Sequence, residues 1–169
     1  TNEQIQEELK ALYDEGGKTL VREVEDLYYR LLEECDLKRS EIYTDKHYRD
    51  LEKQINREMV VLGNQEIKLL SGHLEWALQE IYKDTGIIPY ADKFALLSPS
   101  MVKAIVNRPW SAQHVTSTVW KNKEALAQQL KKGVAECIIT GKSKDKLVES
   151  VMQKTKTGFN NADRVVRTE

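Results

Sequence analysis

The 169-residue chain has few of the residues that interrupt or crosslink a fold: three Pro, eight Gly and two Cys. This composition excludes a collagen-like chain, a low-complexity disordered tract and a disulfide scaffold. No apolar run approaches the roughly 18 residues that a membrane-spanning helix needs, so we expect a soluble protein. Cys35 and Cys137 have neither CxxC spacing nor a nearby His, which favours two reduced thiols over a disulfide or a metal site.

Net charge is also scarce, at −1, but it is divided unevenly along the chain. Residues 1–85 carry 12 Lys+Arg against 20 Asp+Glu, whereas residues 86–169 carry 14 against 7. The basic half is then a candidate for contact with polyanions. A second interpretation stays open, in which the two halves pack together and neutralise each other.

Apolar residues recur at steps of three and four over most of the chain, which is the periodicity of a helix. The first two stripes predict helices over 2–36 and 45–84, the second capped by Thr44 or Asp45. A helix of about 40 residues is roughly 60 Å long, and a short turn makes its neighbour antiparallel. We therefore expect residues 1–85 to form an elongated helical hairpin arm.

The basic half predicts shorter helices separated by caps and breaks. The expected boundaries are a short helix over 101–106, a helix from Ser111 to about Thr140, a stop at Gly141, a start at Ser143, a break at Gly158 and a new cap at Asn160. Trp110 and Trp120 are expected to anchor the corner before the long helix. No stretch alternates with period two, so the predicted fold is all-α: a hairpin arm over 1–85 followed by a smaller helical cluster over 86–169.

Three features of the sequence bear on catalytic or cofactor chemistry. Gly141-Lys142-Ser143 matches the end of a phosphate-binding loop, but Glu136 stands where that motif requires Gly, and a helix precedes it instead of a strand. The three His residues are dispersed without metal-ligand spacing, and no GxSxG elbow occurs. The sequence predicts no catalytic residue, no cofactor and no metal.

Cationic side chains in the basic half are the candidate phosphate contacts for non-specific binding of double-stranded DNA. They are Lys121, Lys123, Lys131, Lys132, Lys142, Lys144, Lys146, Arg164 and Arg167. Their spacing defines no known nucleic-acid motif. Ordinary solubilising charge on helices therefore remains the competing interpretation.

An ordered set of short motifs over 107–169 resembles the tailed-phage minor head proteins, the head-morphogenesis family of phage SPP1 and phage Mu type. The residues that carry the resemblance are Arg108, Pro109, Trp110, Ser111, Trp120, Asn122, Gly141, Ser143, Arg164, Arg167, Thr168 and Glu169. Members usually continue into a region rich in Asp, Cys and His, and usually begin with an aromatic-basic segment. Neither is present here, so we expect a trimmed part of a longer protein.

The resemblance implies a non-enzymatic structural protein in the interior of a phage or prophage capsid. Its implied partners are the portal protein and other head proteins, met in the host cytoplasm during assembly, and it would help to hold or eject packaged DNA. Self-association is a further expectation, and contact with a membrane is not expected. An alternative is the helical arm of a larger effector with a C-terminal toxin domain such as an ADP-ribosyltransferase.

Overall fold

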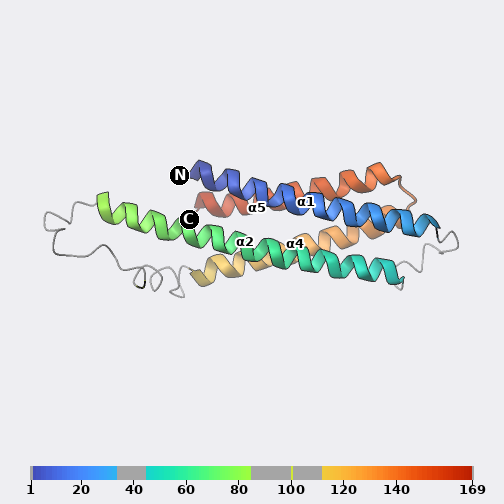
Figure 1. Cartoon of the computed structure of the whole chain (residues 1–169), viewed down its shortest axis with the longest axis horizontal. Coiled ribbons are helices and arrows are strands. Elements are labelled where there is room, and N and C mark those ends of the chain that lie inside the picture. Colours follow the sequence, from blue (N-terminus) through green and yellow to red (C-terminus); the bar gives the residue numbers. More distant parts are fainter. Residues whose placement is uncertain (1, 34–44, 85–99, 101–111, 169) are drawn as a thin grey trace.

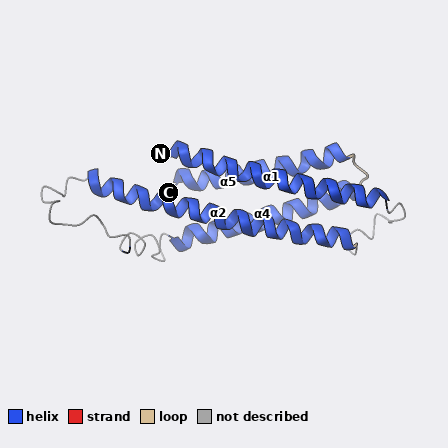
Figure 2. Ribbon diagram, viewed as in Figure 1, coloured by secondary structure: helices blue, strands red, loops and turns tan. Residues whose placement is uncertain are grey.

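The computed structural model describes residues 2–33, 45–84, 100 and 112–168. Within these ranges the chain forms four helices and no strand, which confirms the all-α fold (Figure 2). The helices are α1 (Asn2–Glu33), α2 (Lys46–Asp84), α4 (Ala112–Ile139) and α5 (Lys144–Thr168).

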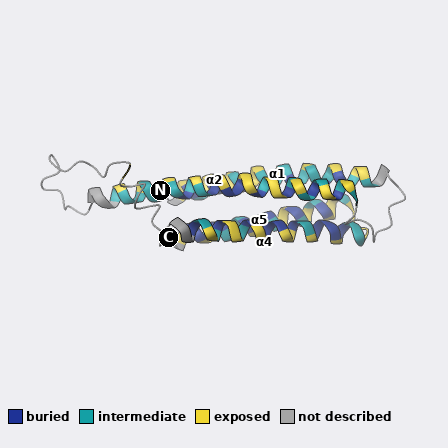
Figure 3. Ribbon diagram, turned by 90° about the horizontal axis from the view of Figure 1, so that it is seen from below, coloured by how far each residue is buried: buried dark blue, intermediate teal, exposed yellow. Residues whose placement is uncertain are grey.

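The four helices form an antiparallel bundle. Helices α1 and α4 run in one direction and α2 and α5 in the other (Figure 1). Each helix packs against two others, in the cyclic order α1, α2, α4, α5. Seen from below, α1 and α2 form one layer and α4 and α5 a second (Figure 3). Neighbours are antiparallel all round the ring, the up-and-down arrangement of a four-helix bundle.

The structure does not confirm a separate hairpin arm beside a smaller cluster. Helices α1 and α2 do form the expected antiparallel hairpin, but α5 packs along α1 and α4 packs along α2. Apolar stripes from both halves of the chain therefore close on one shared core. The acidic half and the basic half lie against each other, as in the second interpretation of the charge pattern. An ion pair joins the two layers at the surface, with Lys144 Nζ 3.6 Å from a Glu25 carboxylate oxygen.

The core is continuous along the bundle and draws on all four helices. Leu9 and Leu20 of α1, Ile55 of α2, Leu130 of α4 and Leu147 of α5 are each at most 1% exposed. All five lie on the apolar stripes that the sequence shows. Burial of a side chain of this size contributes about 1.5–3 kcal/mol. The packing of the stripes, more than intrinsic helix propensity, therefore stabilises helices of this length.

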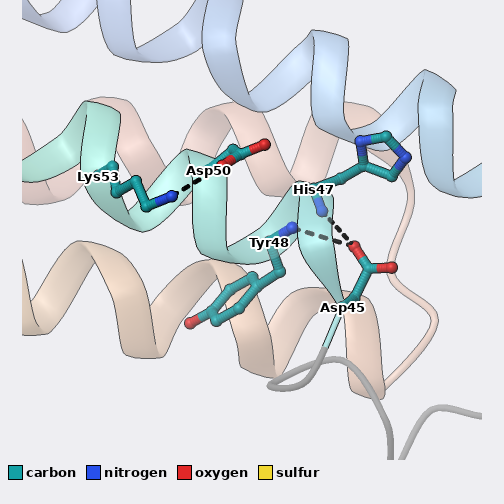
Figure 4. Close-up of polar contacts among 5 residues, drawn as sticks. All are labelled: Asp45, His47, Tyr48, Asp50 and Lys53. Atoms are coloured by element: carbon teal, nitrogen blue, oxygen red, sulfur yellow. Dashed lines mark hydrogen bonds and ion pairs between the residues drawn. The ribbon is translucent and has the colours of Figure 1, made fainter.

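Helix α2 begins at the cap that the sequence predicts (Figure 4). The backbone amides of His47 and Tyr48 donate to Asp45 Oδ1 at 2.8 and 3.0 Å. These bonds satisfy two amides that have no partner within the helix. The Tyr48 hydroxyl then donates to the Lys131 backbone carbonyl of α4 at 3.0 Å, so the first turn of α2 is bound to the other layer.

Gly141, Lys142 and Ser143 form the turn between α4 and α5. Their roles in ending one helix and starting the next account for these residue types without a bound phosphate. Gly141 has a φ of 67°, and its amide donates to the Ile138 carbonyl at 3.0 Å. The Lys142 amide donates to the Cys137 carbonyl at 2.9 Å. These are the bonds of a glycine helix stop. The Ser143 hydroxyl accepts from the amide three residues on, at 3.4 Å, so Ser143 caps α5.

The predicted break at Gly158 and new cap at Asn160 are wrong, because α5 continues through both residues. Its buried side recurs at steps of three and four through Leu147, Val151, Thr155, Gly158 and Ala162. A Cβ on Gly158 would lie 2.7 Å from Leu126 Cδ2 and 3.2 Å from Tyr13 Cε1. Gly158 therefore permits close packing of three helices and does not end one.

The tryptophan corner is described only in part. The predicted helix over 101–106, Trp110 and Ser111 lie outside the described residues. Trp120 is 36% exposed and packs against α2, where a Cβ on Gly63 would lie 2.6 Å from its ring. The aromatic ring thus covers a glycine on the neighbouring helix.

Candidate functional site

A cluster of three polar side chains lies inside the bundle. Lys123 Nζ of α4 is 2.6 Å from Glu66 Oε2 of α2. The Tyr13 hydroxyl of α1 donates to the same Glu66 oxygen at 2.9 Å, and Lys123 Nζ also donates to the Tyr13 hydroxyl. The ammonium group lies 4.6 Å from the centroid of the Tyr13 ring, a cation–π distance. Three helices are thus joined through one carboxylate.

Solvent does not reach this cluster, since Tyr13 and Lys123 are each 2% exposed and Glu66 is fully buried. Burial, then the Glu66 charge and hydrogen bond, raise the pKa of Tyr13 far above its usual value of 10, so its hydroxyl stays protonated. Burial lowers the pKa of Lys123, while the Glu66 carboxylate acts in the opposite direction. The chemistry of the cluster is that of a buried ion pair that joins helices.

The sequence contains a signal for this cluster that the apolar periodicity alone does not reveal. The α2 stripe passes from Leu62 to Leu70 with Glu66 midway, and the α4 stripe passes from Val119 to Leu126 with Lys123 between. Each charged residue occupies a position at which the helix period requires a core side chain. When one apolar stripe is interrupted by an acidic residue and another by a basic residue, a buried ion pair between the two helices is indicated.

The raised pKa of Tyr13 predicts a loss of stability in alkali. Above pH 10 only the unfolded chain ionises Tyr13, so the unfolded state binds fewer protons and stability falls as pH rises. The free energy of unfolding should fall by about 1.4 kcal/mol per pH unit more steeply than in a Tyr13→Phe variant. Urea unfolding between pH 8 and pH 11 measures both slopes, and equal slopes would contradict a protonated, buried Tyr13.

One candidate DNA contact is excluded by its burial. Lys123 is 2% exposed and paired with Glu66, so it cannot reach a phosphate in the folded protein. From the sequence alone Lys123 is a candidate phosphate contact, because an isolated lysine in an amphipathic helix is usually solvated. Its partner on another helix is invisible to a search within one helix.

Several of the remaining cationic residues already have carboxylate partners. Lys146 Nζ lies 2.9 Å from Glu149, and Arg167 lies 2.7 Å from Asp163. Hydrogen bonding to Glu149 raises the pKa of Lys146. Lys144 contacts both Glu25 and the Tyr29 hydroxyl, and Lys132 lies 3.8 Å from Glu136. These exposed pairs are weak and leave the ammonium and guanidinium groups able to exchange partners.

The eight remaining candidates do not form one patch. Lys142, Lys144 and Lys146 gather at the α4–α5 turn, while Arg164 and Arg167 lie near the end of α5 at the other end of the bundle (Figure 1). Lys131 and Lys132 lie between these ends on α4, and Lys121 is near its start. From Lys121 to the end of α4 at Ile139 the helix rises about 27 Å. The layer of α4 and α5 therefore offers a line of positive charge and not one compact patch.

The described residues of the head-protein signature have structural roles where a contact is recorded. Trp120 covers Gly63, Gly141 ends α4 and Ser143 caps α5. Arg167 forms its ion pair one turn from Asp163. Arg108–Ser111 and Glu169 lie outside the described residues.

The described ranges contain neither a candidate metal site nor a candidate membrane-spanning helix. No group of three or more His, Cys, Asp or Glu side chains there could hold a metal ion. No described helix is long and apolar enough to cross a membrane. A scan against protein-family models gives no match, and searches of curated proteins and of solved structures give none either.

Proposed function

We propose that this chain is a non-catalytic structural protein of a tailed-phage or prophage head, acting with the portal protein during assembly in the host cytoplasm and remaining inside the capsid. The ordered set of motifs over 107–169 carries this proposal. The helix caps and the glycine contact made by its described members support it, because they are fold-determining positions. The buried polar cluster also favours a structural role, since it joins three helices.

The distribution of charge supports two different contact surfaces. Helices α1 and α2 together carry 10 Lys+Arg and 16 Asp+Glu, whereas α4 and α5 carry 10 and 5. These pairs form separate layers (Figure 3). By this count of charges, one broad side of the bundle is acidic and the other basic. We assign the acidic layer to protein partners and the basic layer to packaged DNA, since like charge would keep the acidic layer away from phosphates.

Co-assembly with head proteins tests the proposal directly. The chain would be expressed with the portal, scaffolding and major capsid proteins encoded in the same genome, and procapsids would be purified by sedimentation. We expect a few copies per procapsid, and none when the portal gene is omitted. Absence from procapsids that contain the portal would contradict the proposal. A Lys142/Lys144/Lys146→Glu variant should still be incorporated, since these residues lie outside the acidic layer.

Salt dependence tests the assignment of DNA to the basic layer. We expect sequence-independent duplex binding in the range of about 10⁻⁴–10⁻⁶ M, with log affinity falling against log salt by about 0.9 for each phosphate contact. The Lys142/Lys144/Lys146→Glu variant should lose up to about 2.7 of that slope. A Lys46/Lys53/Lys68→Glu variant, with the same charge change in the acidic layer, should keep the parental slope. Equal slopes for the parent and both variants would leave the basic lysines as solubilising charge.

A further inference from the structure

Glycines at the helix contacts of this bundle act as holes that receive a side chain from a neighbouring helix. A Cβ on Gly63 would lie 2.6 Å from the Trp120 ring, and a Cβ on Gly158 would lie 2.7 Å from Leu126. Gly72 of α2 differs, because no described atom lies within 4 Å of its Cβ position. Gly72 is therefore a hole that no side chain of the described part of the chain fills.

Gly72 lies in an apolar groove between the beginning of α1 and the later half of α2. Ile5, Leu12 and Leu69 line the groove, and Trp76 flanks it. Trp76 is 45% exposed, and its ring stacks on His73 with centroids 5.7 Å apart. Helix α2 continues here past the first turn of α1 and the last turn of α5 (Figure 1). The same helix face thus carries an unfilled hole and, one turn later, a large exposed aromatic side chain.

We propose that this face of α2 binds the same face of a second copy of the chain. Residues 72 and 76 lie at equal distances on either side of residue 74. Two α2 helices can pack antiparallel through the face that carries Gly72 and Trp76, with a two-fold axis at the level of residue 74 along the helix. Each Trp76 then lies over Gly72 of the other copy. A two-fold contact is isologous, so one hole and one knob on a single chain satisfy both sides. The Trp120–Gly63 contact shows that a glycine hole on α2 accepts a tryptophan ring.

Charge complementarity and contact size support the same occupant. Lys68 lies six residues before residue 74 and Glu80 six residues after it, so the two-fold brings each Lys68 to the level of Glu80 of the other copy. Opposite charges at matched levels favour the antiparallel register. The contact spans about four turns of one helix. The area that it buries is therefore smaller than the roughly 800 Å² per partner of a standard interface. The dimer should therefore be weak, with a dissociation constant in the micromolar range.

Sedimentation equilibrium of the full chain from about 5 to 500 μM tests this contact. We expect a monomer–dimer equilibrium whose dissociation constant rises at least about tenfold in Trp76→Ala. Gly72→Phe should also abolish the dimer without lowering the thermal midpoint of the monomer, since its side chain enters open space. The control Val60→Ala removes a similarly exposed apolar side chain of α2 from outside the groove and should leave the dissociation constant unchanged.

An exchange of the two residues separates this contact from general hydrophobic association. In the Gly72→Trp/Trp76→Gly variant the two-fold places each new ring over the new hole, so dimerisation should return. A parent that stays monomeric over the whole range would overturn the proposal. So would an unchanged dissociation constant in Trp76→Ala, or a failure of the exchanged variant to dimerise while its circular dichroism melt shows a folded bundle.

Discussion

Lys123→Met is expected to lower the free energy of unfolding by about 3–5 kcal/mol, although it replaces a charged core residue with an apolar one of similar length. The reason is that Glu66, fully buried, loses the ammonium group 2.6 Å away and remains as an uncompensated charge. The Tyr13 hydrogen bond alone does not replace that charge. Urea unfolding followed by circular dichroism measures the loss. Lys121→Met, an exposed lysine two residues away, should change stability by no more than about 0.5 kcal/mol.

The double variant Glu66→Leu/Lys123→Met is expected to recover most or all of the lost stability. Removal of both charges removes the desolvation cost of the pair, and such replacements are often neutral or stabilising by about 1–4 kcal/mol. The Glu66→Leu single variant should be destabilised like Lys123→Met, because it leaves the ammonium group unpaired. The double-mutant cycle then yields a large coupling energy between the two residues. Additive losses in the double variant would contradict a direct buried pair.

Gly158→Ala is expected to destabilise the bundle by about 1–3 kcal/mol, even though alanine favours a helix over glycine by about 1 kcal/mol. Its Cβ would lie 2.7 Å from Leu126 Cδ2 and 3.2 Å from Tyr13 Cε1, and both neighbours are buried. Gly72→Ala is the matched control, since no described atom lies within 4 Å of its Cβ position. At a protein concentration low enough to keep the chain monomeric, the free energy of unfolding of that control should rise by up to about 1 kcal/mol. If the free energy of unfolding rose in both variants, α5 would not approach α4 and α1 as closely as described.

The helix boundaries could be predicted from the sequence where a local signal sets them. Asp45, Gly141 and Ser143 each act through atoms a few residues away, and the structure confirms all three. Gly158 and Asn160 carry the same local signals, yet α5 continues through them because packing against Leu126 and Tyr13 outweighs the weak helix propensity of glycine. Local chemistry does not distinguish a glycine that ends a helix from one that admits a neighbour.

The arrangement of the helices could not be predicted from the stripes alone. An apolar stripe shows which face of a helix is buried, but it does not name the helix that covers it. The length of the 45–84 helix favours a free arm, but in the bundle α2 packs against α4 as well as α1. The assignment of Lys123 to DNA has the same cause, since its partner Glu66 lies 57 positions away on another helix.

The central structural claim is that the acidic and basic halves form one cooperative bundle, and native-state hydrogen exchange tests it most directly. Buried amides of all four helices, such as those of Leu9, Ile55, Leu130 and Leu147, would be compared. We expect them to exchange with one free energy, equal to that of global unfolding, because the two hairpins share a core. If α1–α2 amides exchanged at a free energy several kcal/mol below that of α4–α5 amides, the halves would be separate units and the account would be contradicted.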